Sequence, residues 1–135
     1  MLLSTLLDLV FPPRETEVIV RNLVENKFSL YTKPSHVQNT IYLLDYQKPK
    51  IHALINENKY YQNKRATKLL GHTLEEWSQE QSIPIIFIPI PLSKKRQKER
   101  GYNQVTEILK QFVSDTVFVA EEVFMKKKHT VPQTT

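Results

Sequence analysis

The sequence contains no cysteine and only two glycines, Gly71 and Gly101. Without cysteine, the chain can form no disulfide bond and has no thiolate with which to bind zinc. The lack of cysteine also fits a reducing compartment, so we expect a cytoplasmic protein. Four histidines are present, but they are too scattered along the chain to form a metal site: His36, His52, His72 and His129. We therefore predict no metal site, and no cofactor held by this chain alone.

The sequence also lacks a long apolar run. A helix needs about 20 apolar residues to span a bilayer, and no segment approaches that length. The N-terminus has no basic region and reaches Asp8 early, before Pro12 and Pro13, which argues against a signal peptide. Instead, the apolar face of residues 2–10 predicts an amphipathic helix that packs on the core.

Positive charge exceeds negative charge. The net charge is +5 and the isoelectric point is near 9.4, which favours anionic partners such as phosphorylated metabolites, nucleic acid or an anionic membrane surface. The charged fraction of 24% argues against wholesale disorder. At 135 residues, of which 40% are hydrophobic, the chain can build the modest core of one domain or of part of one.

A basic segment follows a short apolar run. Residues 85–88 read as a buried strand that ends at Pro89 and Pro91, because proline cannot donate a ladder hydrogen bond. Five cations then fall within seven residues: Lys94, Lys95, Arg96, Lys98 and Arg100. Ligands of open α/β sheets gather beyond the carboxyl ends of strands, so a cationic loop there suits phosphate or pyrophosphate. The alternative is a solvated charge run on a connection.

Apolar periodicity predicts the remaining elements. We expect helices near 15–24, 51–58, 63–80 and 105–113, and strands near 41–46, 116–119 and 123–125. Trp77 completes the apolar stripe of the longest helix, which favours a place in the core over a stacking platform. Gly71 costs that helix about 1 kcal/mol relative to alanine, so it indicates close packing. The alternation of helices and strands is typical of an α/β unit.

Four segments of the chain form a series of motifs. The most specific one joins a Pro-Ile-Pro strand end to Glu99-Arg100-Gly101-Tyr102-Asn103-Gln104. The other three are weaker alone: Leu7-Asp8-Leu9-Val10-Phe11-Pro12-Pro13-Arg14, Ile51 to Ile55 with Lys59-Tyr60, and Lys127-Lys128-His129-Thr130-Val131-Pro132-Gln133-Thr134. Together, and in this order, they resemble the ComF/GntX-type family of phosphoribosyltransferase-like proteins, and the resemblance runs nearly from end to end. It implies N-terminal helices followed by the start of a type I phosphoribosyltransferase-like parallel sheet.

The resemblance also implies a division of the chain and a set of ligand-binding residues. Residues 1–80 would form a mainly helical region, and residues 81–135 the first β-loop-α-β part of the transferase-like domain. Residues implied in phosphate or pyrophosphate binding are Lys94, Lys95, Arg96, Arg100, Gly101, Asn103 and Gln104, with Lys59, Tyr60 and Lys128 as additional candidates. Arginine forks suit phosphate oxygens, and Gly101 permits a tight turn. Asn103 equally fits a helix cap.

The chain departs from the family in two places. Many members carry a four-cysteine, zinc-ribbon-like element after Phe-Pro-Pro-Arg, which is absent here. Active members also bind ribose 5-phosphate with an acidic pair followed by a Thr/Gly-rich turn. Neither Glu75-Glu76 nor Glu121-Glu122 is followed by such a turn. We therefore expect an incomplete sheet, a truncated protein and no catalytic base or nucleophile. Mg²⁺ with phosphoribosyl pyrophosphate is expected only for a full-length relative.

Three functions remain open at this point. The first is an enzyme: the chain fits the N-terminal portion of a phosphoribosyltransferase of unknown acceptor. Because the family is linked to competence, it also fits a DNA-uptake module whose basic loop binds nucleic-acid phosphates. The third interpretation is an inactive remnant or a partner-dependent fragment. An incomplete sheet would leave an unpaired edge strand, which predicts self-association. Of these functions, we favour a family member that binds an anion but does not transfer phosphoribose alone.

Overall fold

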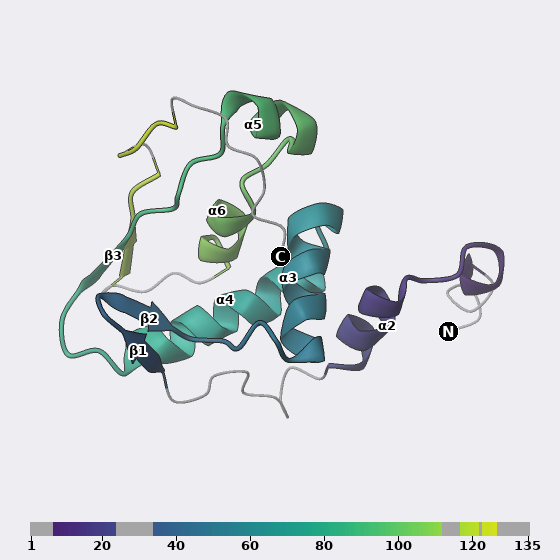
Figure 1. The fold of residues 1–135 in the computed structure, drawn as a ribbon, viewed down its shortest axis with the longest axis horizontal. Coiled ribbons are helices and arrows are strands. Elements are labelled where there is room, and N and C mark those ends of the chain that lie inside the picture. The colour runs from purple at the N-terminus through teal and green to yellow at the C-terminus, as the bar shows by residue number, and fades with distance from the viewer. Residues whose placement is uncertain (1–6, 24–33, 112–116, 122, 127–135) are drawn as a thin grey trace.

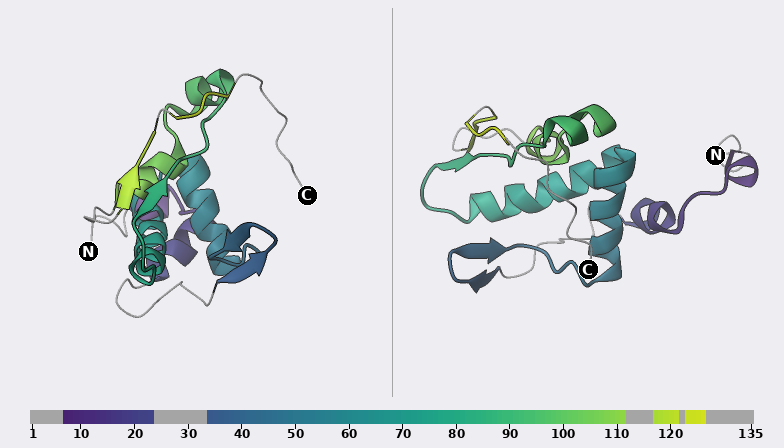
Figure 2. Two further views of the ribbon diagram at one scale, coloured as in Figure 1. Left: turned by 90° about the vertical axis from the view of Figure 1, so that its left-hand side faces the viewer. Right: turned by 45° about the horizontal axis from the view of Figure 1, so that its top comes forward.

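The computed structural model describes residues 7–23, 34–111, 117–121 and 123–126. Its elements in chain order are α2 Glu15–Asn22, β1 Ser35–Val37, β2 Thr40–Tyr42, α3 Pro49–Tyr61, α4 Lys64–Gln79, β3 Ile85–Phe87, α5 Lys94–Arg100, α6 Gln104–Leu109 and β4 Val117–Val119. Helices occupy the middle of the molecule, and the strands form two small, separate pairs (Figures 1 and 2). The described part is therefore mixed α/β, as predicted. None of its helices is long and apolar enough to cross a bilayer.

Helices α2, α3 and α4 enclose the core. Its members are aliphatic side chains with little or no exposure: Val20, Leu23, Ile51, Ala53, Leu54, Ala66, Leu69 and Leu70. Both long helices begin at residues that favour a helix start. Pro49 occupies the first turn of α3, where a backbone N–H would have no partner within the helix. The side chain of Asn63 caps α4 by accepting from the backbone N–H groups of Arg65 and Ala66. The helices expected near 15–24, 51–58 and 63–80 are thus confirmed.

A buried carboxylate ties these three helices together. The side chain of Glu57, on α3, is 0% exposed. Arg14 donates to both its oxygens from Nε and Nη2, at 3.1 and 3.0 Å, and Thr16 and Asn63 donate at 2.6 and 3.0 Å. The guanidinium of Arg65 on α4 in turn donates to the last carbonyls of α2. Arg14 and Thr16 thus attach the start of α2 to α3, and Asn63 attaches the start of α4 to α3. Arg65 attaches α4 to the end of α2.

Gly71 allows α6 to approach α4 closely. A Cβ atom at this position would lie 2.6 Å from Cβ of Gln111 and 3.2 Å from the carbonyl oxygen of Ile108. Such distances leave no room for a methyl group, so the close packing expected at Gly71 is confirmed. The contact attaches the second half of the chain to the helical core, and Ile108 packs against that core.

Strands β3 and β4 form a parallel pair, joined by a connection that contains α5 and α6. Ile85 pairs with Val117 and Phe87 with Val119. The strand expected at 85–88, the following helix and the strand near 116–119 are thus confirmed, although α6 ends at Leu109. Trp77 is partly buried, and its ring lies 6.1 Å from that of Phe87. Trp77 thus packs against β3 at one edge of the core.

The expected docking of the N-terminal helix is wrong for its described part. Residues 7–10 are helical, but Leu7 and Val10 from the predicted packing face are 53% and 63% exposed. Pro12 and Pro13 separate this turn from α2, and its contact is polar: Asp8 pairs with Arg21 at 2.7 Å. Residues 1–6 of the predicted helix lie outside the described residues.

Two strand predictions also need correction. The strand expected at 41–46 covers only Thr40–Tyr42, because Leu44 instead packs against the helical core. Its antiparallel partner β1 was not predicted. Residues 123–125 form no strand, and Val123, Phe124 and Met125 are 53%, 62% and 80% exposed.

Candidate functional site

The basic segment is a helix and not the predicted loop. Ser93 caps it by accepting from the backbone N–H of Arg96, and Gly101 ends it in the left-handed region at φ 77°. No atom lies within 4 Å of a Cβ built on Gly101, so glycine is needed here for its backbone conformation and not for space. The lysines, arginines, glutamine and glutamate between these residues are good helix formers, which explains why the segment coils.

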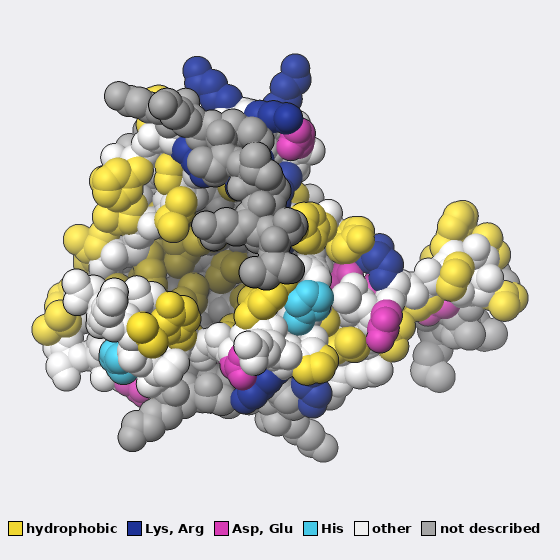
Figure 3. All heavy atoms as spheres, in the orientation of Figure 1, with side chains coloured by type: hydrophobic (Ala, Val, Ile, Leu, Met, Phe, Trp, Pro, Cys, Tyr) yellow, Lys and Arg dark blue, Asp and Glu magenta, His cyan; other side chains and the backbone are white. Residues whose placement is uncertain are grey.

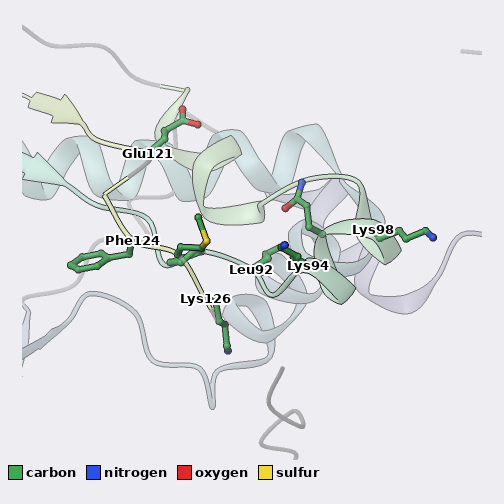
Figure 4. Close-up of a pocket in the computed structure, with 9 residues that line it drawn as sticks. Leu92, Lys94, Lys98, Glu121, Phe124 and Lys126 are labelled. Atoms are coloured by element: carbon green, nitrogen blue, oxygen red, sulfur yellow. The ribbon is translucent and has the colours of Figure 1, made fainter. Parts of the chain in front are cut away.

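One side of α5 borders a pocket of about 690 Å³. Apolar side chains and three lysines line it: Pro91, Leu92, Lys94, Gln97, Lys98, Glu121, Phe124, Met125 and Lys126. In Figure 4, Glu121 and Lys126 project in opposite directions from the segment after β4, while Lys98 extends away from Phe124. The cations of α5 also stand out at one end of the molecule in Figure 3. The pocket thus carries more positive than negative charge, which suits an anion.

Three of the five predicted cations of α5 do not line this pocket: Lys95, Arg96 and Arg100. Lys95 lies 3.9 Å from Glu99, and both side chains are more than half exposed. The backbone of Arg96 completes the cap at Ser93 at 3.4 Å. The predicted basic cluster is therefore divided around a helix, as expected when charges are spaced along a helical turn.

The last arginine of α5 joins an aromatic cluster, which we call the Tyr60 cluster and define as Lys59, Tyr60, Arg100 and Gln104. The Lys59 ammonium lies 4.9 Å from the centre of the Tyr60 ring, and the Arg100 guanidinium lies 5.5 Å from it. Arg100 also donates to Oε1 of Gln104 at 3.1 Å. Two cations on one exposed ring form a surface suited to an anion or to a planar group.

Tyr102 and Asn103 position these residues. The Tyr102 hydroxyl donates to the carbonyl oxygens of Asn58 and Lys59 at 2.9 and 3.2 Å, which holds the turn after α5 against the end of α3. Asn103 caps α6 by accepting from the N–H of Val105 at 3.0 Å, and it donates to the carbonyl of Ile90 at 3.1 Å. The capping role expected for Asn103 is thus confirmed.

A second, smaller pocket opens beside the Tyr60 cluster, between the chain after β2 and helices α3, α4 and α6. Its volume is about 320 Å³, and its lining is mostly apolar: Leu43, Leu44, Ile55, Asn58, Lys59, Leu70, Thr73, Leu74, Gln104, Val105 and Ile108. Figure 3 shows a hollow with apolar walls on this face of the molecule. No sequence pattern predicts this pocket, because its walls come from four separate segments.

The structure thus brings together some of the expected site residues and separates others. Lys59, Tyr60, Arg100 and Gln104 meet, Lys94 faces the larger pocket, and Lys128 lies outside the described residues. Within the described ranges, no group of three or more histidine, aspartate or glutamate side chains is placed to hold a metal ion. Comparisons with protein-family models, with curated proteins and with solved structures find no match for the chain.

Proposed function

We propose that this chain is a phosphoribosyltransferase-like protein of the ComF/GntX type that binds phosphate or pyrophosphate groups at α5. One observation carries the proposal. The Lys59-Tyr60 and Glu99-to-Gln104 segments, which resemble the family independently, lie in contact through the Tyr102 hydroxyl and the Tyr60 ring. The contact gathers Arg100 and Lys59 at one place, and Lys94 and Lys98 lie on the same short helix as Arg100. Arginine and lysine are the residues that proteins use to bind phosphate oxygens.

The proposal includes anion binding but not phosphoribosyl transfer. Transfer needs stabilisation of both the leaving pyrophosphate and the ribose phosphate. The sequence has no acidic pair followed by a Thr-Gly turn that would hold the ribose phosphate. We therefore propose that the chain holds pyrophosphate or phosphoribosyl pyrophosphate without cleaving it, and that Mg²⁺ enters only with the ligand.

Calorimetric titration with pyrophosphate and with phosphoribosyl pyrophosphate, with and without Mg²⁺, tests this proposal. The double variant Arg96→Ala/Arg100→Ala should bind at least about tenfold more weakly, because it loses two charged forks. The matched control, Lys48→Ala/Lys64→Ala, removes the same charge from exposed positions outside α5 and should bind as the unmodified chain does. Equal affinity of the arginine double variant and the control would refute the site. Release of pyrophosphate in the presence of nucleobases would refute the absence of transfer.

A second candidate function, binding of single-stranded nucleic acid, is favoured by the exposed Tyr60 ring. The ring is part of a side chain that is 56% exposed and is flanked by two cations. The sequence itself did not interleave aromatic and basic residues, but the fold places Tyr60 beside Arg100. Aromatic rings stack on bases with about 1–3 kcal/mol per base, and cations bind the phosphates.

Fluorescence anisotropy with a labelled single-stranded oligonucleotide at several salt concentrations tests this candidate. Tyr60→Ala should weaken binding by about fivefold or more, the factor that corresponds to about 1 kcal/mol of lost stacking. Tyr42→Ala is the control, because Tyr42 is similarly exposed, at 50%, and lies on β2. An oligonucleotide affinity that changes neither with salt concentration nor in Tyr60→Ala would exclude this function.

We also propose a second copy of the chain as a partner. Strands β3 and β4 form a parallel pair, and parallel sheets are normally covered on both faces. Ile86 and Phe118 from this pair are 64% and 56% exposed. Pairing of two such units would cover these side chains and supply ladder partners.

A further inference from the structure

The smaller pocket has the size and lining of a site for a small, largely apolar molecule. Its volume of about 320 Å³ lies at the lower end of the range for ligand pockets, about 300–1,000 Å³. Helices form most of its walls: Ile55 comes from α3, Leu70 and Leu74 from α4, and Ile108 from α6. The chain after β2 supplies Leu43 and Leu44. A ligand of one or two rings would cover these side chains without displacing a helix.

The polar side chains in the pocket divide into two groups. The first group is already bonded within the protein: Asn58 donates to Oγ1 of Thr67 at 2.9 Å, and Thr73 donates to the carbonyl of Leu69 at 3.1 Å. These side chains have few bonds left to offer a ligand. The second group is Lys59 and Gln104, which the pocket shares with the Tyr60 cluster. The rim of the pocket is therefore where a ligand would be recognised by polar contacts.

The charge at that rim is not neutralised by carboxylates in the described part of the chain. The ion pairs of the described residues include those of Arg14, Arg21, His72, Lys95 and Lys110, and none is seen for Lys59 or Arg100. Arg100 donates to the amide oxygen of Gln104, and Lys59 lies over a neutral ring. An apolar pocket bordered by a lysine that no carboxylate neutralises suits a molecule with one apolar end and one anionic end.

We propose that this pocket binds a small organic monoanion, with its apolar body between α3, α4 and α6 and its anionic group at Lys59. This site adjoins the pyrophosphate site of α5 and shares Lys59 with it. It differs in that its walls are apolar and Lys94, Lys95 and Arg96 do not line it. The ligand class follows from the lining: the walls favour rings or branched aliphatic carbon, and the ammonium favours a carboxylate, sulfonate or phosphate monoester.

Methyl NMR of the full chain with 1-naphthoate as probe tests the proposal. Ile55 and Ile108 line the pocket, whereas Ile86 and Ile90 are 64% and 76% exposed on the β3 side of the molecule. The δ1-methyl signals of Ile55 and Ile108 should shift and saturate with 1-naphthoate, and those of Ile86 and Ile90 should not. Equal shifts at all four methyls would mean non-specific adhesion, and no shift at millimolar probe would mean no site. Either result overturns the proposal.

Two variants, each with a matched control variant, and a neutral probe test the role of each part of the pocket. Lys59→Met should weaken 1-naphthoate binding about tenfold, and Lys64→Met, which removes an exposed lysine of α4, should leave it unchanged. The neutral 1-naphthamide should bind to the unmodified chain about tenfold more weakly than 1-naphthoate. Val105→Phe should fill the pocket and abolish binding, whereas Val18→Phe on the exposed side of α2 should not. If Val105→Phe does not fold, the methyl shifts of the unmodified chain still show whether 1-naphthoate binds in the pocket.

A result in which the amide binds as tightly as the acid would refute the anionic end of the proposal. A failure of this proposal can also be told apart from a failure of the proposed pyrophosphate site. Arg96→Ala should weaken pyrophosphate binding and leave the 1-naphthoate shifts unchanged. Loss of one ligand without the other therefore identifies which of the two sites is wrong.

Discussion

At the scale of single residues, Glu57 is the side chain whose charge state matters most for stability. Burial alone would raise its pKa, but hydrogen bonds from Arg14, Thr16 and Asn63 outweigh burial and lower the pKa of Glu57 below its ordinary value of 4.5. The unfolded chain therefore binds this proton more readily than the folded chain does. The contribution of Glu57 to stability is complete above its unfolded pKa and is lost as the pH falls through the lower, folded value.

We expect the free energy of unfolding to decrease with acidification below about pH 4.5, and Glu57→Gln to weaken this dependence. At neutral pH the variant should be less stable by about 1.5–3 kcal/mol, because charged hydrogen bonds are lost and donors are left facing an amide. Urea unfolding between pH 3 and pH 7 measures both effects. The control Glu15→Gln alters an exposed carboxylate at the start of α2 and should keep the full pH dependence.

Gly71 gives a second prediction at this scale. Alanine is the better helix former by about 1 kcal/mol, but overpacking costs about 1–3 kcal/mol. Because the new methyl would meet the Cβ of Gln111 at 2.6 Å, we expect Gly71→Ala to lower the free energy of unfolding by about 1 kcal/mol. Denaturant unfolding of Gly71→Ala/Gln111→Gly should recover part of this loss. Stabilisation by Gly71→Ala alone would show that α6 does not pack here.

At the scale of elements, Asn103 connects α6 to the chain that follows β3. Its side chain caps α6 and donates to Ile90, so its two functions can be separated by substitution. Asn103→Ala should cost about 1 kcal/mol or more, the usual cost of a lost cap, whereas Asn103→Asp should keep the cap and lose only the donor to Ile90. Denaturant unfolding of the two variants should rank Asp above Ala in stability. The reverse order would contradict the capping geometry.

A helix or strand could be predicted where the residues within it and at its ends carry the pattern that determines it. Helices α3 and α4 follow from apolar periodicity with Pro49 and Asn63 at their starts, and β3 follows from Ile85–Phe87 and the prolines after it. Strand β1 has no such signal: Ser35–Val37 is short and exposed, and it pairs through a turn in which Gln38 adopts φ 52°. Dense charge is typical of a solvated connection and predicts a loop at α5, but the same residues are good helix formers between Ser93 and Gly101.

The candidate site shows the same limit. Motif resemblance pointed to Arg100, Gln104, Lys59 and Tyr60 separately, but only the fold shows that they share one surface. The smaller pocket could not be predicted at all, since its walls depend on how α6 crosses α4. Spacing along the chain gives no information on contacts between residues that are 40 or more positions apart.

At the scale of the whole molecule, we expect concentration-dependent self-association through the β3–β4 pair. The sedimentation coefficient should rise with protein concentration, because pairing covers exposed apolar side chains. Ile86→Lys should suppress this rise by placing charge on the strand pair. Val37→Lys is the control, since Val37 is 56% exposed on the separate β1–β2 pair. Monomeric behaviour of the unmodified chain at all concentrations would refute the expectation.

The contact between Trp77 and Phe87 makes the fluorescence of Trp77 a probe of whether β3 stays packed on α4. Trp77 is the sole tryptophan of the chain, and it lies where α4 meets β3. Its emission therefore follows the docking of the strand pair, while far-ultraviolet ellipticity follows the helices. Coincident unfolding curves from the two signals would describe a single cooperative unit. If the emission changes first, the strand pair detaches while the helical core persists, and ligands that bridge the two parts would bring the curves together.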